Sequence, residues 1–154
     1  MVCCTLLITR PDACFDVAYL GGCVTKPTSE DMKFGQKLVA RIQAHPDYGI
    51  VTRRIDCRWG QLIIVIFSDA GWAIRKSLHS QAGTLIVLSH PSVLEGRTAI
   101  CNIVDFGSNK ITWSVTSSYD AELHGVQIGN DGGENLQCML SEITSWNLHW
   151  QTTD

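Results

Sequence analysis

Hydrophobic residues in the first third of the chain recur at helical spacing. Pro11 is suited to the first turn of a short helix that ends at Gly21. Thr28 and Asp31 have the spacing of a capping box, and the apolar residues behind them recur every three or four positions as far as His45. The pattern predicts two helices, the second with one apolar stripe that must pack against another element.

The middle of the chain carries short apolar runs instead. Residues 61–68 and 83–89 are continuous runs rich in β-branched side chains, as in strands covered on both faces. Two further strands are predicted at 98–104 and 110–115, with a turn at Gly107 between them. Because the connections are short, we expect antiparallel neighbours, with the first run as a central strand.

The last third is predicted to return to helix. Ser118 begins a helix with Asp120 favourably placed in its first turn. Each glycine inside a helix costs about 1 kcal/mol relative to alanine, so the pair at 132–133 is expected to break it. A second helical stretch follows at 134–143, and the loose alternation of 146–154 favours the start of a strand. This order of elements predicts an α+β fold with an antiparallel meander.

Composition describes a globular protein without a strong charge bias. Hydrophobic residues make up 45% and charged residues 18%, which excludes a disordered tail. The net charge of −3 lacks the positive surplus of a free-standing nucleic-acid binder. Seven cysteines without a C-x-x-C pair predict free thiols in a reducing compartment. The apolar run at 62–67 is too short to cross a bilayer, so we expect an intracellular protein, in the cytoplasm or nucleus, without a membrane partner.

Two carboxylates are the best candidates for chemistry. Asp69 follows the first apolar strand, where a fold presents reactive groups from a rigid base. Glu122 lies in the first turns of the last helix, and a strand end with a facing helix can hold two carboxylates close together. Such oxygen ligands suit Mg²⁺. Two ions about 4 Å apart can clamp an in-line displacement at phosphorus, although that chemistry takes three or four carboxylates.

Each of these residues also has a purely structural interpretation. Asp69 can cap the turn after its strand, and Glu122 can be an ordinary surface residue. Arg75 and Lys76 either meet a phosphate backbone or lie in a solvated loop. His124 is about 200° around the helix from Glu122, so we expect a structural or exposed histidine. Motifs of serine hydrolases, zinc proteases, phosphate loops and dinucleotide sites are absent from the sequence.

Short motifs follow one another along nearly the whole chain. They are T-R-P-D (9–12), K-P-T (26–28), H-P-D-Y-G (45–49), S-D-A-G-W-A (68–73), R-K-S (75–77), I-T-W-S (111–114) and S-S-Y-D-A-E (117–122). In this order they resemble the C-terminal part of the Pol polyprotein of copia-type retrotransposons. The resemblance implies a helical connection segment from a reverse transcriptase at 1–58. At 59–154 it implies a truncated RNase H-like domain with a mixed sheet.

The resemblance also implies an activity and its residues. It implies a two-metal nuclease that uses Mg²⁺, or alternatively Mn²⁺, to hydrolyse the RNA strand of RNA–DNA hybrids. Asp69 would be the first ligand and Glu122 the second, with Arg75 and Lys76 contacting nucleic acid. The implied partners are the hybrid and the rest of a Pol polyprotein, with no small-molecule substrate. The hybrid would be recognised through 2′-hydroxyls and phosphates.

The departures from the family pattern concern the remaining ligands. The third carboxylate of the family lies in a D-N pair about 30 residues after the helix glutamate, and Asp154 is the candidate here at that distance. Gly71 replaces an acidic residue, and the fourth carboxylate and the catalytic-loop histidine have no counterpart. Whether the chain is an enzyme is therefore open: we expect a truncated or decayed copy with weak or lost hydrolysis. The alternatives are a non-catalytic module that binds nucleic acid or protein, and a product without a selected role.

Overall fold

The computed structural model describes residues 9–73 and 79–150, with side chains as far as residue 145. Helices and strands follow one another in the predicted order, so the α+β class is confirmed. The elements are η1 (Pro11–Ala13), α2 (Cys14–Gly21), α3 (Ser29–Ala44), η2 (Trp59–Gln61), β1 (Ile63–Gly71), β2 (Gln81–Ser89), η3 (Pro91–Glu95), β3 (Cys101–Lys110) and α4 (Ser118–Trp150).

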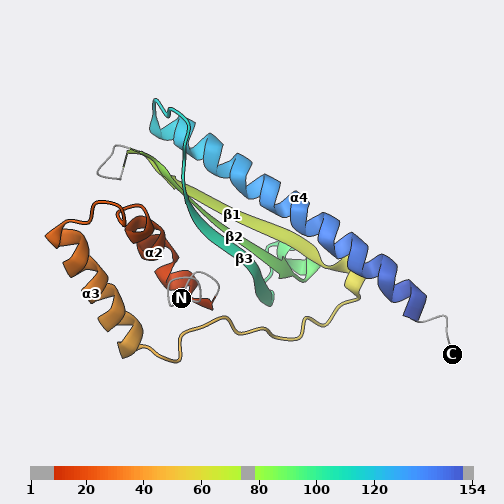
Figure 1. Cartoon of the computed structure of the whole chain (residues 1–154). Coiled ribbons are helices and arrows are strands. Elements are labelled where there is room, and N and C mark those ends of the chain that lie inside the picture. Colours follow the sequence, from red (N-terminus) through yellow and green to blue (C-terminus); the bar gives the residue numbers. More distant parts are fainter. Residues whose placement is uncertain (1–8, 74–78, 151–154) are drawn as a thin grey trace.

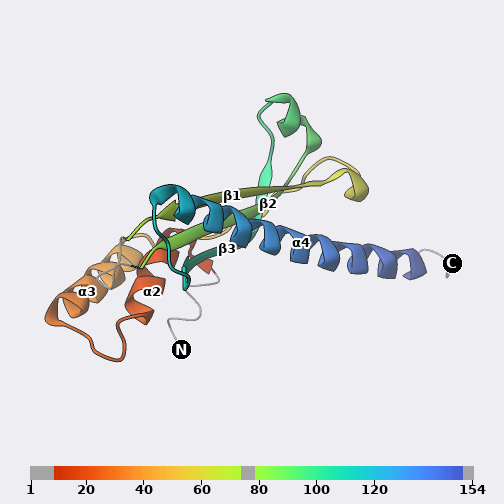
Figure 2. The same cartoon turned by 90° about the horizontal axis from the view of Figure 1, so that it is seen from above.

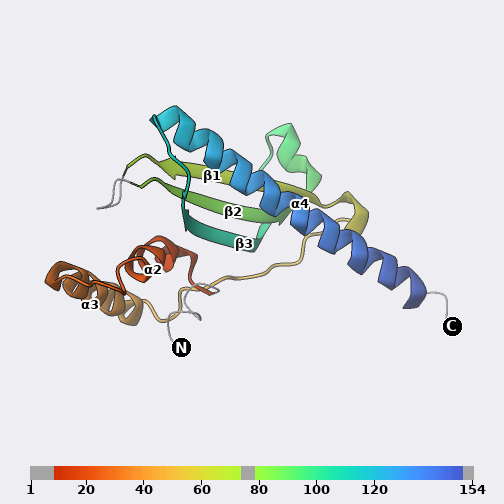
Figure 3. The same cartoon turned by 45° about the horizontal axis from the view of Figure 1, so that its top comes forward.

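The three strands form one antiparallel sheet in the order β1-β2-β3, which confirms the predicted meander. The long helix α4 lies along one face of the sheet, and α2 and α3 lie on the other side (Figures 1 and 3). The connection between β2 and β3, which carries η3, projects away from these layers (Figure 2). The sheet therefore separates the N-terminal helices from α4.

The two N-terminal helices form as predicted. Pro11 stands at the start of η1, and Thr28 caps α3. The capping box is complete, because the Thr28 hydroxyl accepts from the Asp31 N–H at 3.2 Å and the Asp31 carboxylate accepts from the Thr28 N–H at 2.8 Å. The apolar stripe of α3 packs on α2. Their common core consists of Ala13, Val17 and Leu38, flanked by Leu20 and Ile42.

The predicted break at the glycine pair is wrong, because α4 is one continuous helix of 33 residues. Its glycines lie on the side that faces the sheet, where a Cβ would meet strand side chains. A Cβ on Gly129 would lie 2.9 Å from Ile66 Cγ2, and one on Gly132 would lie 2.8 Å from Ile86 Cδ1. A Cβ on Gly133 would overlap Ile66 Cδ1. Close packing of α4 on the sheet thus offsets the low helix propensity of glycine.

The first strand differs from its prediction in length and position. β1 continues to Gly71, so Asp69 lies inside the strand and pairs with Gly83 of β2. β1 was expected to be central and covered on both faces. Within the described part of the chain β2 is the central strand, and it is also the most buried, while β1 forms an edge.

The two strands predicted at 98–104 and 110–115 are a single strand, β3. No turn forms at Gly107, because this residue pairs with Thr84 of β2 and its missing side chain gives room to the Thr84 hydroxyl. Beyond β3 the chain leaves the sheet, and Ile111 packs with Ala82 and Ala121 in a second core under α4.

The strand predicted at 146–154 is also not found in the described part, because α4 continues through residue 150. The remaining residues, 151–154, lie outside the described ranges. The inner side of α4 lies over β1 and β2 between Gly125 and Gly133, and its C-terminal part projects beyond the sheet (Figure 2).

Candidate functional site

Asp69 lies on the face of the sheet that is turned away from α4. Its neighbour Ala70 faces the helix, because a Cβ built on Gly125 would lie 3.4 Å from the Ala70 Cβ. Side chains alternate along a strand, so the exposed carboxylate of Asp69 leaves β1 on the opposite side, toward η1 and α2.

Glu122 lies in the turn of α4 that precedes this contact. Gly125, three residues later, lies over the backbone of Asp69, with 3.6 Å between its ideal Cβ and the Asp69 carbonyl oxygen. At about 100° per residue, Glu122 points within about 20° of the directions of Gly129 and Gly133. Both of these glycines lie over Ile66 of β1. The exposed Glu122 side chain therefore leaves α4 on the side of β1.

The two candidate carboxylates thus lie at the same end of β1 but start from different layers. Ala70 and Gly125, rather than Asp69 and Glu122, meet in the contact between strand and helix. No group of three or more His, Cys, Asp or Glu side chains within 9–73 and 79–145 is arranged to hold a metal ion. Arg75, Lys76 and Asp154 are outside the described residues.

A groove of ≈ 510 Å³ opens beside Asp69 between the sheet and the N-terminal helices. The register places Asp69, Gly83 and Ser108 side by side on three adjacent strands. Cys14 and Phe15 of α2 line the opposite wall. Burial raises the pKa of the Cys14 thiol above its ordinary value, and a hydrogen bond from the Ser108 backbone opposes this in part. Cys14 is therefore protonated at neutral pH.

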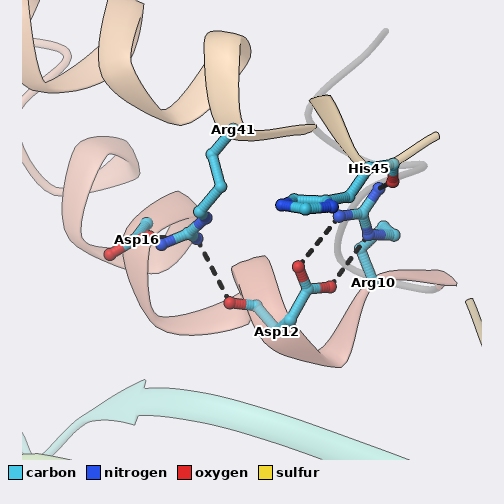
Figure 4. Close-up of polar contacts among 5 residues, drawn as sticks. All are labelled: Arg10, Asp12, Asp16, Arg41 and His45. Carbon is cyan, nitrogen blue, oxygen red and sulfur yellow. Dashed lines mark hydrogen bonds and ion pairs between the residues drawn. The ribbon is translucent and has the colours of Figure 1, made fainter. Parts of the chain in front are cut away.

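Two of the short sequence motifs, T-R-P-D and H-P-D-Y-G, meet in one polar cluster (Figure 4). Arg10, only 5% exposed, donates to both carboxylate oxygens of Asp12, at 2.8 and 2.9 Å. Its third contact is a donation to the His45 carbonyl oxygen at 3.0 Å. The guanidinium also lies 5.6 Å from the centre of the Tyr48 ring. Hydrogen bonding to Arg10 lowers the pKa of the Asp12 carboxyl below its ordinary value.

A second arginine strengthens the same cluster from α3. Arg41 donates to the Asp12 carbonyl oxygen at 3.2 Å and pairs with the Asp16 carboxylate at 2.5 Å. These contacts tie the end of α3 to η1 and α2, which makes the cluster structural. Sequence reasoning used T-R-P-D and H-P-D-Y-G only as signatures and missed their contact. The contact could have been expected from the residue types, because the guanidinium of Arg10 in one motif can pack on the ring of Tyr48 in the other.

His124 has a structural role at the start of α4, as expected. Its Nε2 lies 3.6 Å from an oxygen of Asp120, one turn earlier, and its ring packs edge-on against Trp113 at 4.9 Å. Asp120 in turn donates its N–H to the Ser117 hydroxyl at 3.1 Å. These contacts fix the turn from which Glu122 extends.

Comparison with protein-family models, curated proteins and solved structures found no match for this chain. Within the described ranges, no helix combines the length and the apolar character needed to cross a membrane.

Proposed function

We propose that the chain is part of an RNase H-like nuclease domain, preceded by the connection segment of a copia-type reverse transcriptase. Asp69 and Glu122 would be two of its metal ligands, and the RNA strand of an RNA–DNA hybrid its substrate. The observation that carries the proposal is the position of Glu122. It lies within one helical turn of the point where α4 crosses the backbone of Asp69.

The arrangement of elements supports the same interpretation. A meander of three antiparallel strands precedes one helix that covers a single face of the sheet. The first strand carries Asp69, and the first turns of the helix carry Glu122. Both carboxylates are exposed, so neither is used in the core.

The two donors fit a hard cation in type, but they are few in number and start from different layers, Asp69 on the face turned away from α4 and Glu122 on α4 itself. Carboxylate oxygens suit Mg²⁺, and Mn²⁺ accepts the same ligands. Asp69 and Glu122 would hold the ion, which when bound would activate water and stabilise the leaving oxygen at phosphorus. Because three or four carboxylates are normally needed, we expect residues 1–154 to bind the ion weakly. Hydrolysis by this chain alone should then be slow or undetectable.

Cleavage of a labelled RNA–DNA hybrid tests the enzymatic part of the proposal. We expect at most weak cleavage, stronger with Mn²⁺ than with Mg²⁺, and lost in Asp69→Asn and Glu122→Gln. Asp105 on β3 and Glu142 on α4 are exposed carboxylates of the same sheet and the same helix. Their variants Asp105→Asn and Glu142→Gln serve as matched controls and should leave the cleavage unchanged. Efficient cleavage would contradict the expected weakness. Cleavage that survives Asp69→Asn would contradict the site itself.

Mapping of Mn²⁺ by nuclear magnetic resonance tests the site even where cleavage is undetectable. The paramagnetic ion broadens amide signals near its binding position. We expect broadening around Asp69 and Glu122, and its disappearance in Asp69→Asn. Broadening confined to other acidic positions, such as Asp131 and Glu134 on α4, would refute the proposed metal site.

A non-catalytic binding module is the second candidate function. The observation that favours it is the groove beside Asp69, which offers a recessed surface that needs no metal ion. Binding of an RNA–DNA hybrid without cleavage, weakening as salt is raised, would support this candidate.

A further inference from the structure

Gly83 is a glycine that the fold itself does not require. It lies inside β2, the central strand, where glycine weakens a sheet and often marks a place that a ligand approaches closely. Its backbone is not in the left-handed region. Among the described residues, a Cβ at this position would meet only the Asp69 carbonyl oxygen, at an ordinary 3.9 Å. A side chain would therefore fit the sheet, and its absence leaves open space above β2.

The groove above Gly83 is lined by polar and apolar side chains. Asp69 and Ser108 flank it on the neighbouring strands. Phe67, two residues before Asp69, lies on the same face and is 55% exposed. Phe15 of α2, 43% exposed, lines the same groove. A flat ring would thus meet two aromatic side chains and one carboxylate.

The carboxylate selects among flat rings by its hydrogen bonding. An ionised carboxylate only accepts, and its two oxygens suit two adjacent donors. Among the common nucleobases, guanine presents two neighbouring N–H groups on its pairing edge. Adenine and cytosine present a donor beside an acceptor, and uracil presents one donor between two acceptors. Asp69 would attract the first pattern and repel the acceptors in the others.

We propose that the groove over Gly83 binds a guanine base, with its N–H edge on Asp69 and its ring against Phe15 and Phe67. Aromatic side chains hold bases of every type by stacking, so preference for guanine would come from Asp69. The binding does not depend on a metal ion or on hydrolysis, and an ion held by Asp69 would compete with the base for the same carboxylate. The base can come from a free guanine nucleotide or from a single-stranded RNA.

Calorimetric titration of the full chain with GMP and AMP, in EDTA, tests this proposal. We expect GMP to bind at least about tenfold more tightly than AMP, because the carboxylate meets an unfavourable acceptor in adenine. Asp69→Asn should remove the preference, while Asp105→Asn, an exposed carboxylate on β3, should retain it. Equal affinities for GMP and AMP, or a preference that survives Asp69→Asn, would overturn the proposal.

Filling the groove is the second arm of the test. Gly83→Ala places a methyl group where a Cβ fits the sheet, and should weaken GMP binding while the melting temperature stays the same or rises slightly. Phe67→Ser, which removes a half-exposed ring, should weaken GMP and AMP alike. Full GMP affinity in both variants would place the base elsewhere and overturn the proposal.

Two oligonucleotides distinguish the sources of the base. An eight-residue oligouridine with one internal guanine is compared with the same strand carrying adenine. Tighter binding of the guanine strand than of GMP identifies single-stranded RNA as the source, and the reverse identifies the free nucleotide. If neither GMP nor the guanine strand binds in EDTA, the guanine proposal is wrong. The proposed Mn²⁺ site would not be affected by this result, because it is tested separately.

Discussion

The two faces of the three-stranded sheet are covered in different ways. On one face α4 approaches so closely that strand side chains occupy the places where Gly129, Gly132 and Gly133 have no Cβ. On the other face the covering elements are the short helices η1 and α2, and a groove remains beside Asp69. A glycine on the α4 face is therefore in close contact with strand side chains, whereas a glycine on the other face borders a groove.

The difference shows how a glycine can be interpreted once its neighbours are known. Glycines of α4 are explained by the contact of helix and sheet, because an added Cβ would meet Ile66 or Ile86. Gly83 on the other face has no such neighbour among the described residues. The α4 face is held by apolar contact, whereas the N-terminal helices are also fixed by the polar cluster of Arg10, Asp12 and Arg41. The predictions below test whether the faces differ in this way.

A β-branched residue in the contact between α4 and β1 should have the largest effect. Gly133→Val would force its side chain into Ile66, and we expect a loss of about 3 kcal/mol in the free energy of unfolding, as for severe overpacking. Urea unfolding followed by circular dichroism measures this loss. Asp131→Val is the matched control, because residue 131 is exposed on the same helix.

A second substitution identifies the cause of that loss. Ile66→Ala removes the side chain that the valine introduced by Gly133→Val would strike, so the double variant should be more stable than the sum of the two single effects predicts. Additive effects would show that the close contact does not limit stability. Helix propensity alone would make Gly133→Val slightly stabilising, so unchanged or increased stability in this variant would show that the close contact with Ile66 does not limit stability.

Much of the fold was predictable because local signals agreed with tertiary contacts. The box at Thr28 and Asp31, the start at Pro11 and the apolar runs of β1 and β2 all formed. Two of the errors arose at glycine. Gly107 suggested a turn and the glycines of α4 suggested a break, yet each accommodates a side chain from another element. A single sequence does not show which distant side chain will fill such a place.

The candidate site was predictable in part. The strand and helix that carry Asp69 and Glu122 were identified, and the structure brings their backbones together near Gly125. The sequence did not reveal that Asp69 faces away from α4, because β1 has no alternation of polar and apolar residues from which its faces could be assigned. The role of Asp69 and Glu122 as metal ligands stays a prediction.

Acid should loosen the groove face before the α4 face. Arg10 lowers the pKa of Asp12 below its ordinary 3.8, so folding favours the ionised carboxylate. The resulting stabilisation is fully present above about pH 4 and is lost as the pH falls through the lower pKa of the folded state. Amide exchange in α2 and α3 should therefore rise in this acidic range earlier than exchange in α4.

Asp12→Asn removes the titrating group and tests the sign of this effect. The difference in stability between the original chain and the variant should be largest above about pH 4 and should shrink at lower pH. A difference that grows on acidification would contradict the assigned pKa direction. Simultaneous loss of protection in α2, α3 and α4 would contradict the separate behaviour of the two faces.

Cys14 provides the smallest and most local test, because its thiol lies between α2 and the sheet on the groove face. It is 6% exposed and burial raises its pKa, whereas Cys101 and Cys138 are free and exposed. Burial shields the Cys14 sulfur and, by raising its pKa, lowers the fraction of thiolate, so we expect iodoacetamide to modify Cys14 more slowly than the exposed pair.

The same alkylation rate shows by which route Cys14 becomes accessible. If the groove face opens on its own, the rate at Cys14 should change little in Gly133→Val, which destabilises the α4 face. Peptide mass spectrometry of both chains measures this site by site. A rate that rises in proportion to the loss of stability would mean that Cys14 reacts only through global unfolding. Both faces would then belong to one cooperative unit, and the difference between them would be one of packing and not of stability.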